Sequence, residues 1–247
     1  MNMDALEDYA DERLLDGCIY CGGPIETREH VPSRSLLDDP KPDNLPVVGA
    51  CESCNKQFSK DEEYLACLID CVIAGSTDPA LIRRSKVAKM LRHSPALQAR
   101  IGAAKSTNGE QVQFSIEVDR VRNVITKLAQ GHSAFELSQC HRHEPETLHW
   151  QPLELMDPHA RDLFEAPEIV QQFGELGTRS MQRMVMAQVS LQSADGKMKN
   201  LGIFVNDWIV VQEGRYRYLA SDCADGIQIR MVIGEYLACL VCWSDDE

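Results

Sequence analysis

The sequence predicts an α+β protein in three parts: a cysteine-rich N-terminal module over residues 1–75, a helical region over 76–140 and a β-rich antiparallel region over 141–247. Gly, Pro and Cys are concentrated between residues 17 and 58, and apolar residues then recur at helical spacing as far as residue 131. After residue 184, alternating apolar and polar residues are separated by turn sequences. The 247 residues, 44% of them apolar, suffice for a substantial core.

The expected elements follow from periodicity and from residues that start or stop helices. Ser59 and Glu62 have the form of a capping box, which predicts a helix from about Lys60, whereas Pro95 and Gly131 each predict the end of a helix. In order, we expect a helix over 4–15, strands over 26–31 and 45–48, helices over 60–75, 79–94 and 95–104, a strand over 111–117 and a helix over 118–131. The turn-like segments after residue 184 predict a meander of antiparallel strands.

Composition and charge restrict the setting and the partners. The chain has no run of roughly 18 apolar residues. Its acidic N-terminus lacks the basic start of a signal peptide, so we expect a cytoplasmic protein without a membrane partner. In that setting, ten cysteines indicate metal binding rather than a disulfide framework. The net charge of −13 disfavours indiscriminate binding to polyanions.

One stretch departs from this acidic character. Residues 79–109 contain seven basic residues and no acidic one. Two interpretations remain open for it: a nucleic-acid footprint, or a solvated helix face that balances acidic neighbours. The residues expected to contact nucleic acid, if the first holds, are Arg83, Arg84, Lys86 and Lys89.

Four cysteines form two pairs of the same spacing. Cys18 and Cys21 make one CxxC, and Cys51 and Cys54 make the other. Each CxxC presents two thiolates from one tight turn, and two such turns complete a tetrahedral Zn²⁺ site. Four protein ligands leave no open position, so this zinc is expected to be structural. The 29 residues between the pairs exceed the gap of an ordinary zinc ribbon.

Further short motifs lie between and beside these pairs. In order, the motifs are Cys18-x-x-Cys21, Glu29-His30-x-Pro32, Asn44-Leu45-Pro46 and Cys51-x-x-Cys54-Asn55. In order and approximate spacing they resemble the HNH endonucleases, the ββα-metal family, in its zinc-stapled form. The resemblance covers residues 18–64. It implies a hairpin packed on a helix around one divalent ion, Mg²⁺ or Mn²⁺.

The resemblance also implies a role for each matching residue. Glu29 takes the place of the acidic metal ligand, and His30 that of the base that deprotonates the attacking water. Asn44 matches the middle residue that helps to fix the histidine, and Asn55 the second ligand of the catalytic ion. An unperturbed histidine pKa near 6.5 suits His30 to accept a proton at neutral pH. Arg28 and Arg34 flank the motif and either grip phosphate or are ordinary surface arginines.

Two positions depart from the commonest pattern of that family. Glu29 stands where aspartate is usual, and Phe58 stands where a basic residue or histidine often follows the asparagine. Asp61, Glu62 and Glu63 are therefore alternative carboxylates for the catalytic ion, although the capping box accounts for Glu62 without a metal.

Other patterns have simpler explanations. Cys239 and Cys242 lie in a strand-like segment, where residues three apart face opposite sides and suit a core better than a zinc site. Cys67 and Cys71 share a helix face and are also expected in the core. A second metal cluster of histidines and a stacking platform of aromatic residues are weaker alternatives. Their members are His141, His143, His149 and His159 for the first, and Trp208, Tyr216, Tyr218 and Trp243 for the second.

The expected function is therefore a metal-dependent endonuclease acting on DNA. RNA is not excluded as the substrate, and the alternative is a zinc-knuckle module that binds nucleic acid or a partner without cutting it. An effector nuclease of a bacterial defence system fits by analogy. A homodimer or a complex with other proteins is compatible with a single site that cuts one strand.

Overall fold

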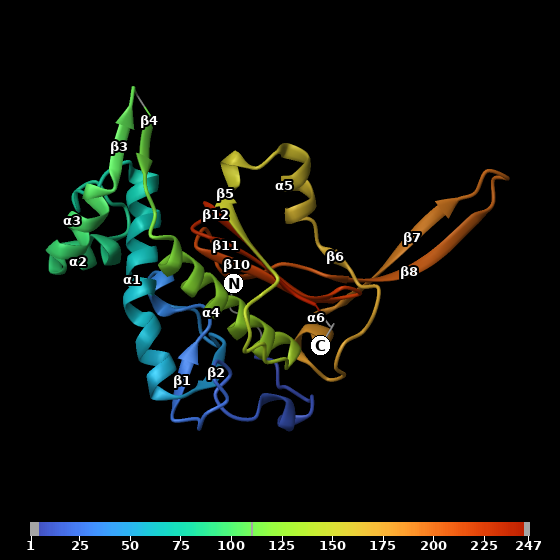
Figure 1. The fold of residues 1–247 in the computed structure, drawn as a ribbon. Helices are drawn as coiled ribbons and strands as arrows, with labels where there is room; N and C mark the ends of the chain where they lie inside the picture. Colours follow the sequence, from blue (N-terminus) through green and yellow to red (C-terminus); the bar gives the residue numbers. More distant parts are fainter. Residues whose placement is uncertain (1–4, 110, 245–247) are drawn as a thin grey trace.

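The computed structural model describes residues 5–109 and 111–244, and the predicted α+β class is confirmed. Helices concentrate in the middle of the chain, and the last strands form an antiparallel sheet (Figure 1). Within the described residues, no helix has the length and apolar character needed to cross a membrane.

The N-terminal part contains a short antiparallel hairpin that leads directly into a long helix. After the 3₁₀ helix η1 (Glu12–Leu15), strand β1 (Thr27–His30) pairs with β2 (Val47–Ala50), so that His30 lies opposite Val47. The connection between the strands contains the 3₁₀ helix η2 (Arg34–Leu36). Helix α1 (Glu52–Ala74) follows β2 after one residue, and Gly75 ends it in the left-handed conformation.

The start of α1 corrects the expectation of a helix from Lys60. Cys51 is the N-cap, and its Sγ accepts a hydrogen bond from the Cys54 N–H at 3.4 Å. The expected capping box does not form, because Ser59 Oγ donates to the Lys56 carbonyl and the Glu62 side chain is buried in contacts with other elements. The helix expected over 4–15 is reduced to η1; Asp4 lies outside the described residues.

The middle region is helical, with one hairpin. Its elements are α2 (Ser85–His93), α3 (Pro95–Ala103), β3 (Lys105–Asn108), β4 (Gln111–Phe114) and α4 (Val118–Leu137). Helix α2 begins six residues later than the 79–94 prediction. Helix α4 continues through Gly131 to Leu137, and its C-cap Ser138 is left-handed, so Gly131 does not end the helix as expected.

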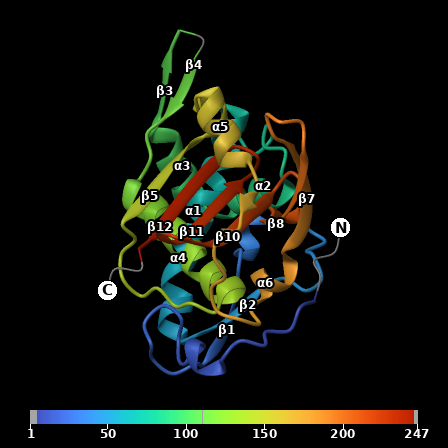
Figure 2. The same cartoon turned by 90° about the vertical axis from the view of Figure 1, so that its right-hand side faces the viewer.

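The C-terminal region contains a five-stranded antiparallel sheet in the order β5-β12-β11-β10-β9, and Figure 2 shows β12, β11 and β10 side by side. Its strands are β5 (Thr147–Pro152), β9 (Ile209–Gln212), β10 (Tyr216–Cys223), β11 (Gly226–Ile233) and β12 (Leu237–Trp243). Between β5 and β9 lie η3 (Leu153–Leu155), α5 (Pro158–Glu165), β6 (Glu168–Ile169) and α6 (Arg179–Arg183), followed by β7 (Val185–Gln192) and β8 (Met198–Asn206).

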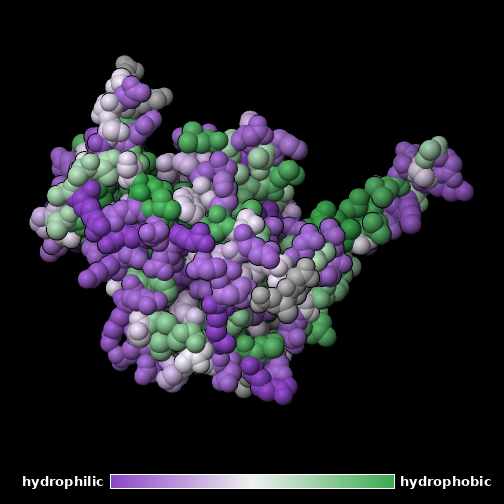
Figure 3. Space-filling view, in the orientation of Figure 1, coloured by the Kyte–Doolittle hydropathy of each residue, from purple (hydrophilic) through white to green (hydrophobic). Residues whose placement is uncertain are grey.

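Strands β7 and β8 form a ribbon that projects from the body (Figure 1). One face of the ribbon is apolar except at its tip, because Val185, Val189 and Leu191 share it with their cross-strand partners, among them Leu201 and Val205. Val185, Leu191 and Leu201 are exposed, and apolar surface extends along the ribbon in Figure 3. The two-stranded ribbon therefore exposes hydrophobic side chains of the kind that the rest of the fold buries in its core.

The main core lies where α1 and α4 meet the five-stranded sheet. It includes Leu65 and Cys67 from α1, Ile125 from α4, and Tyr218 and Cys239 from the sheet. A smaller cluster surrounds the hairpin β1–β2 and the paired cysteines. Helix α4 contributes to both clusters, and this fixes the sheet relative to the N-terminal hairpin.

Candidate metal centre and the surrounding motif residues

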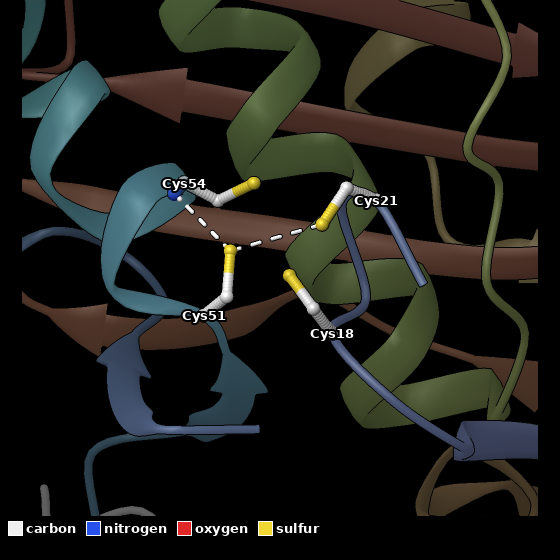
Figure 4. A group of neighbouring side chains, drawn as sticks. All are labelled: Cys18, Cys21, Cys51 and Cys54. Atoms are coloured by element: carbon white, nitrogen blue, oxygen red, sulfur yellow. Dashed lines mark hydrogen bonds between the residues drawn. The ribbon is translucent and has the colours of Figure 1, made fainter. Parts of the chain in front are cut away.

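The four paired cysteines converge in space, as their spacing predicts. Their sulfur atoms all lie within 4.8 Å of one another, and Figure 4 shows the four side chains pointing toward one centre. The Cys21 and Cys51 sulfurs are 3.7 Å apart. Tetrahedral zinc with bonds of about 2.3 Å separates its sulfur ligands by about 3.8 Å. The cluster is therefore compatible with a structural zinc.

Local structure brings the two pairs together. Cys18 and Cys21 lie in a turn closed by the Gly22 N–H, which donates to the Cys18 carbonyl at 2.7 Å. Gly22 has φ +78°, a conformation that disfavours residues with a Cβ. The second pair occupies the N-terminus of α1, where Cys51 is the cap and Cys54 lies in the first turn. The cluster thus joins the segment before β1 to the helix after β2.

Electrostatics in the cluster favour thiolate at one cysteine and disfavour it at another. Burial opposes ionisation of Cys18, but the backbone N–H groups of Cys51, Tyr20 and Cys21 lower its pKa to about 7. Burial raises the pKa of Cys54, and the neighbouring sulfurs raise it further. Without a cation, four adjacent thiols cannot all ionise, whereas a divalent metal compensates the charge.

Glu29 is buried and paired with a lysine that is distant in the sequence. Its Oε1 lies 2.7 Å from Lys127 Nζ, on α4. The same ammonium forms an ion pair with Glu62 of α1, and Ser33 Oγ donates to Glu62 Oε2 at 2.8 Å. Burial raises the pKa of Glu29, and Lys127 opposes that shift. We call Glu29, Ser33, Glu62 and Lys127 the Lys127 cluster.

His30 is half-buried at the end of β1. Burial lowers its pKa, with a smaller contribution from the Arg34 guanidinium, so the imidazole is neutral near pH 7. Its Nδ1 is buried and makes no hydrogen bond to any described residue. A neutral imidazole has one protonated and one unprotonated nitrogen, and the unprotonated one can accept a proton.

The two asparagines of the motif differ in setting. Asn44 is exposed in the β1–β2 connection, with φ +59°, and asparagine tolerates this left-handed conformation better than most residues do. Asn55 lies in the first turns of α1, and its Nδ2 donates to Thr27 Oγ1 at 2.9 Å. Thr27 and Glu29 lie on the same side of β1, which places Asn55 and Glu29 on the same hairpin–helix boundary.

The basic residues expected to contact nucleic acid divide into two groups. Arg28, Arg34, Arg83 and Lys89 are exposed. Arg84 is buried and forms ion pairs with Asp38 at 2.6 Å and Asp70 at 2.9 Å, so the structure does not present it to a phosphate. Lys86 Nζ donates to the backbone carbonyls of Arg34 and Leu37. The basic surface is therefore smaller than the sequence suggests.

The structure supports neither a histidine metal cluster nor an aromatic stacking platform within the described residues. No second cluster of His, Cys, Asp or Glu with metal-binding geometry occurs within residues 5–109 and 111–244. Cys239 is buried in the core, as are Cys67 and Cys71. Tyr216, Tyr218 and Trp243 are buried too, and so do not form an exposed stacking platform.

A polar group that the sequence pattern does not predict lies inside the core. His132 of α4 is fully buried, stacks on the Tyr218 ring with centroids 3.7 Å apart, and its Nε2 lies 2.8 Å from the Tyr216 hydroxyl. Nothing in the sequence around His132 indicates this environment, because both aromatic partners come from a distant strand.

Comparisons with protein-family models, curated proteins and solved structures find no match to this chain. Its function is therefore inferred from its own residues.

Proposed function

We propose that residues 18–64 form an HNH-type module that hydrolyses phosphodiester bonds in DNA, with His30 as the base. The observation that carries the proposal is the hairpin β1–β2 followed directly by α1, with the motif residues on β1, in the β1–β2 connection and on α1. His30 ends β1, Asn44 lies in the connection to β2, and Asn55 lies near the start of α1. The two cysteine pairs join the ends of this unit.

Zinc has a mechanical role in this proposal. Bound by the four cysteines, it cross-links the turn before β1 to the first turn of α1. With four thiolate ligands it has no open position for substrate or water. Its contribution is to hold β1, which carries His30, in a fixed position relative to α1, which carries Asn55.

The chemistry assigned to His30 follows from its protonation state. A neutral imidazole near pH 7 accepts a proton from a water molecule as that water attacks phosphorus. Exposed Arg28 and Arg34, on either side of His30 in the chain, can bind the phosphodiester through charge-assisted hydrogen bonds. Proton transfer and phosphate binding are thus provided by residues close together in sequence.

The residues beside His30 do not fit a catalytic Mg²⁺ or Mn²⁺ in the arrangement described. Glu29 Oε1 lies 2.7 Å from the Lys127 ammonium, which keeps a second cation away from that oxygen. This favours a second candidate function: a zinc-stabilised module that binds nucleic acid or a protein without cutting it. RNA in place of DNA is the remaining alternative, because neither arginine distinguishes the two.

A cleavage assay separates these functions. Supercoiled plasmid, single-stranded DNA and RNA are incubated with Mg²⁺, Mn²⁺ or a chelator, using the wild type and Lys127→Ala, which frees Glu29. Adding His30→Ala to whichever protein cuts should reduce the rate by about 100-fold or more. His159→Ala, at an exposed histidine on α5, should leave the rate unchanged.

Each outcome selects one function. Cleavage that survives His30→Ala would remove His30 from the mechanism. Binding of nucleic acid with no cleavage by either protein would overturn the nuclease and select the binding module. The nucleic acid that is cut identifies the substrate class.

A further inference from the structure

The Lys127 cluster has the properties of a buried cation site. Lys127 is 1% exposed, and its ammonium lies between carboxylates from two different elements, Glu29 on β1 and Glu62 on α1. The Phe58 ring centroid is 5.2 Å from Nζ on another side. A cation held in this way joins β1, α1 and α4 at one point.

The groups around the ammonium are mainly oxygen donors. Ser33 Oγ is hydrogen-bonded to the second oxygen of Glu62. The Tyr20 hydroxyl is buried and has no hydrogen-bond partner among the described residues, and the Tyr20 ring packs on Phe58 with centroids 5.3 Å apart. Carboxylate, hydroxyl and water oxygens are the ligands that Mg²⁺, Mn²⁺ and Ca²⁺ prefer. An unsatisfied buried hydroxyl is uncommon, so the Tyr20 oxygen is a further candidate ligand for an ion.

Charge supports the same interpretation. In their ionised forms, Glu29 and Glu62 bring two negative charges, of which one ammonium compensates one. Buried charge is costly unless it is paired. A divalent ion would balance both carboxylates, but Nζ already occupies the position between Glu29 Oε1 and Glu62 Oε1. The ion and the lysine therefore exclude each other.

We propose that Glu29 and Glu62 form a divalent-cation site that Lys127 of α4 fills, so that the conformation described here is closed to metal. The inference concerns ion binding alone; its consequence for catalysis, that cleavage requires Lys127 to withdraw, rests on the proposed nuclease function. Lys127 is a positioning residue in this scheme and does not contact substrate.

The packing of α4 determines how Lys127 could withdraw. Gly131, one helical turn after Lys127, packs on Val31, the residue that follows His30. A displacement of α4 would therefore move Lys127 and the support of His30 together. Access of an ion to Glu29 is thereby linked to the placement of His30.

Ion binding in the absence of nucleic acid tests this inference. Zinc-loaded wild type and Lys127→Ala are titrated with Mn²⁺, free Mn²⁺ is followed by electron paramagnetic resonance, and thermal unfolding is recorded with and without millimolar Mn²⁺. Lys127→Ala should bind one Mn²⁺ at least about tenfold more tightly than the wild type. Its Tm should fall below that of the wild type and rise by about 5 °C or more with Mn²⁺.

Two control variants show where the ion binds. Adding Glu62→Gln to Lys127→Ala should abolish the new Mn²⁺ binding. Arg84→Ala removes another buried cation that lies between two carboxylates, but Arg215 remains 2.7 Å from Asp38, so no Mn²⁺ site should appear. A gain of Mn²⁺ binding in both Lys127→Ala and Arg84→Ala would overturn the inference.

Two further results would also overturn it: tight Mn²⁺ binding by the wild type that disappears in Glu29→Gln, or no binding by folded Lys127→Ala. If Lys127→Ala does not fold even with Mn²⁺, Lys127→Met, which keeps most of the side-chain volume, is judged by the same criteria. Failure to cut nucleic acid bears on the proposed function alone, because no substrate is present in these titrations.

Discussion

Gly131 of α4 lies directly against Val31, the residue after His30. A Cβ at position 131 would be 2.6 Å from Val31 Cγ2 and 2.9 Å from Val31 Cγ1. The contact explains why a glycine occurs inside a helix that continues to Leu137. It also brings α4 close enough to β1 for Lys127 to reach Glu29.

Gly131→Ala should therefore destabilise the protein, by about 1–3 kcal/mol, because the added methyl overpacks the α4–β1 contact. Urea unfolding measures the change. Gly102→Ala in α3 is the matched control, because a Cβ there meets its nearest neighbour at an ordinary 3.4 Å. That substitution should be neutral or stabilise by up to about 1 kcal/mol. Equal effects of the two substitutions would contradict the close contact.

Removal of metal should unfold the N-terminal module. We expect one zinc per chain by elemental analysis, loss of that zinc in Cys18→Ser, and a lower Tm after treatment with a strong chelator, because metal binding contributes to folding. Cys223→Ser lies outside the cluster and should retain the zinc. A full complement of zinc in Cys18→Ser would show that the metal binds elsewhere or that three thiolates suffice.

Stability should fall in mild acid because of His132. Burial lowers the pKa of this histidine to about 3, against an ordinary value of 6.5. Between those pH values the unfolded chain binds a proton that the folded chain does not, so stability decreases as pH falls below 6.5, by up to about 1.4 kcal/mol per pH unit. Urea unfolding at pH 7 and pH 5 should show a smaller loss for His132→Phe than for the wild type. Tyr216→Phe, which removes only the hydroxyl contact, should retain the wild-type dependence; an unchanged dependence in His132→Phe would refute this origin.

Short sequence motifs predicted those parts of the fold that depend only on residues close together in the chain. Identical CxxC spacing was enough to bring Cys18, Cys21, Cys51 and Cys54 together, since each pair needs only one turn. Alternation predicted the strands after residue 184 but not β5, and Pro95 correctly separated α2 from α3.

Long-range partners could not be predicted in this way. The capping-box interpretation of Glu62 failed because a lysine 65 residues away forms an ion pair with it. Lys127 lies in a helix that is buried on most sides, and nothing local shows that its ammonium meets two carboxylates. Gly131 appeared to end α4 because the close neighbour that requires a glycine, Val31, is distant in sequence.

Replacing the basic residues one at a time should distinguish those that bind DNA from those that stabilise the fold. Arg34→Ala should weaken DNA binding and reduce its dependence on salt while leaving Tm unchanged, because Arg34 is exposed and one phosphate contact releases about one counterion. Arg84→Ala leaves Asp70 buried without its partner, and should lower the free energy of unfolding by about 3–5 kcal/mol. Salt-dependent binding and urea unfolding of both variants measure the two effects. If Arg84→Ala weakened binding at unchanged stability, the arginine would have to reach the surface when DNA binds, and the ion pairs with Asp38 and Asp70 would then belong to the free protein alone.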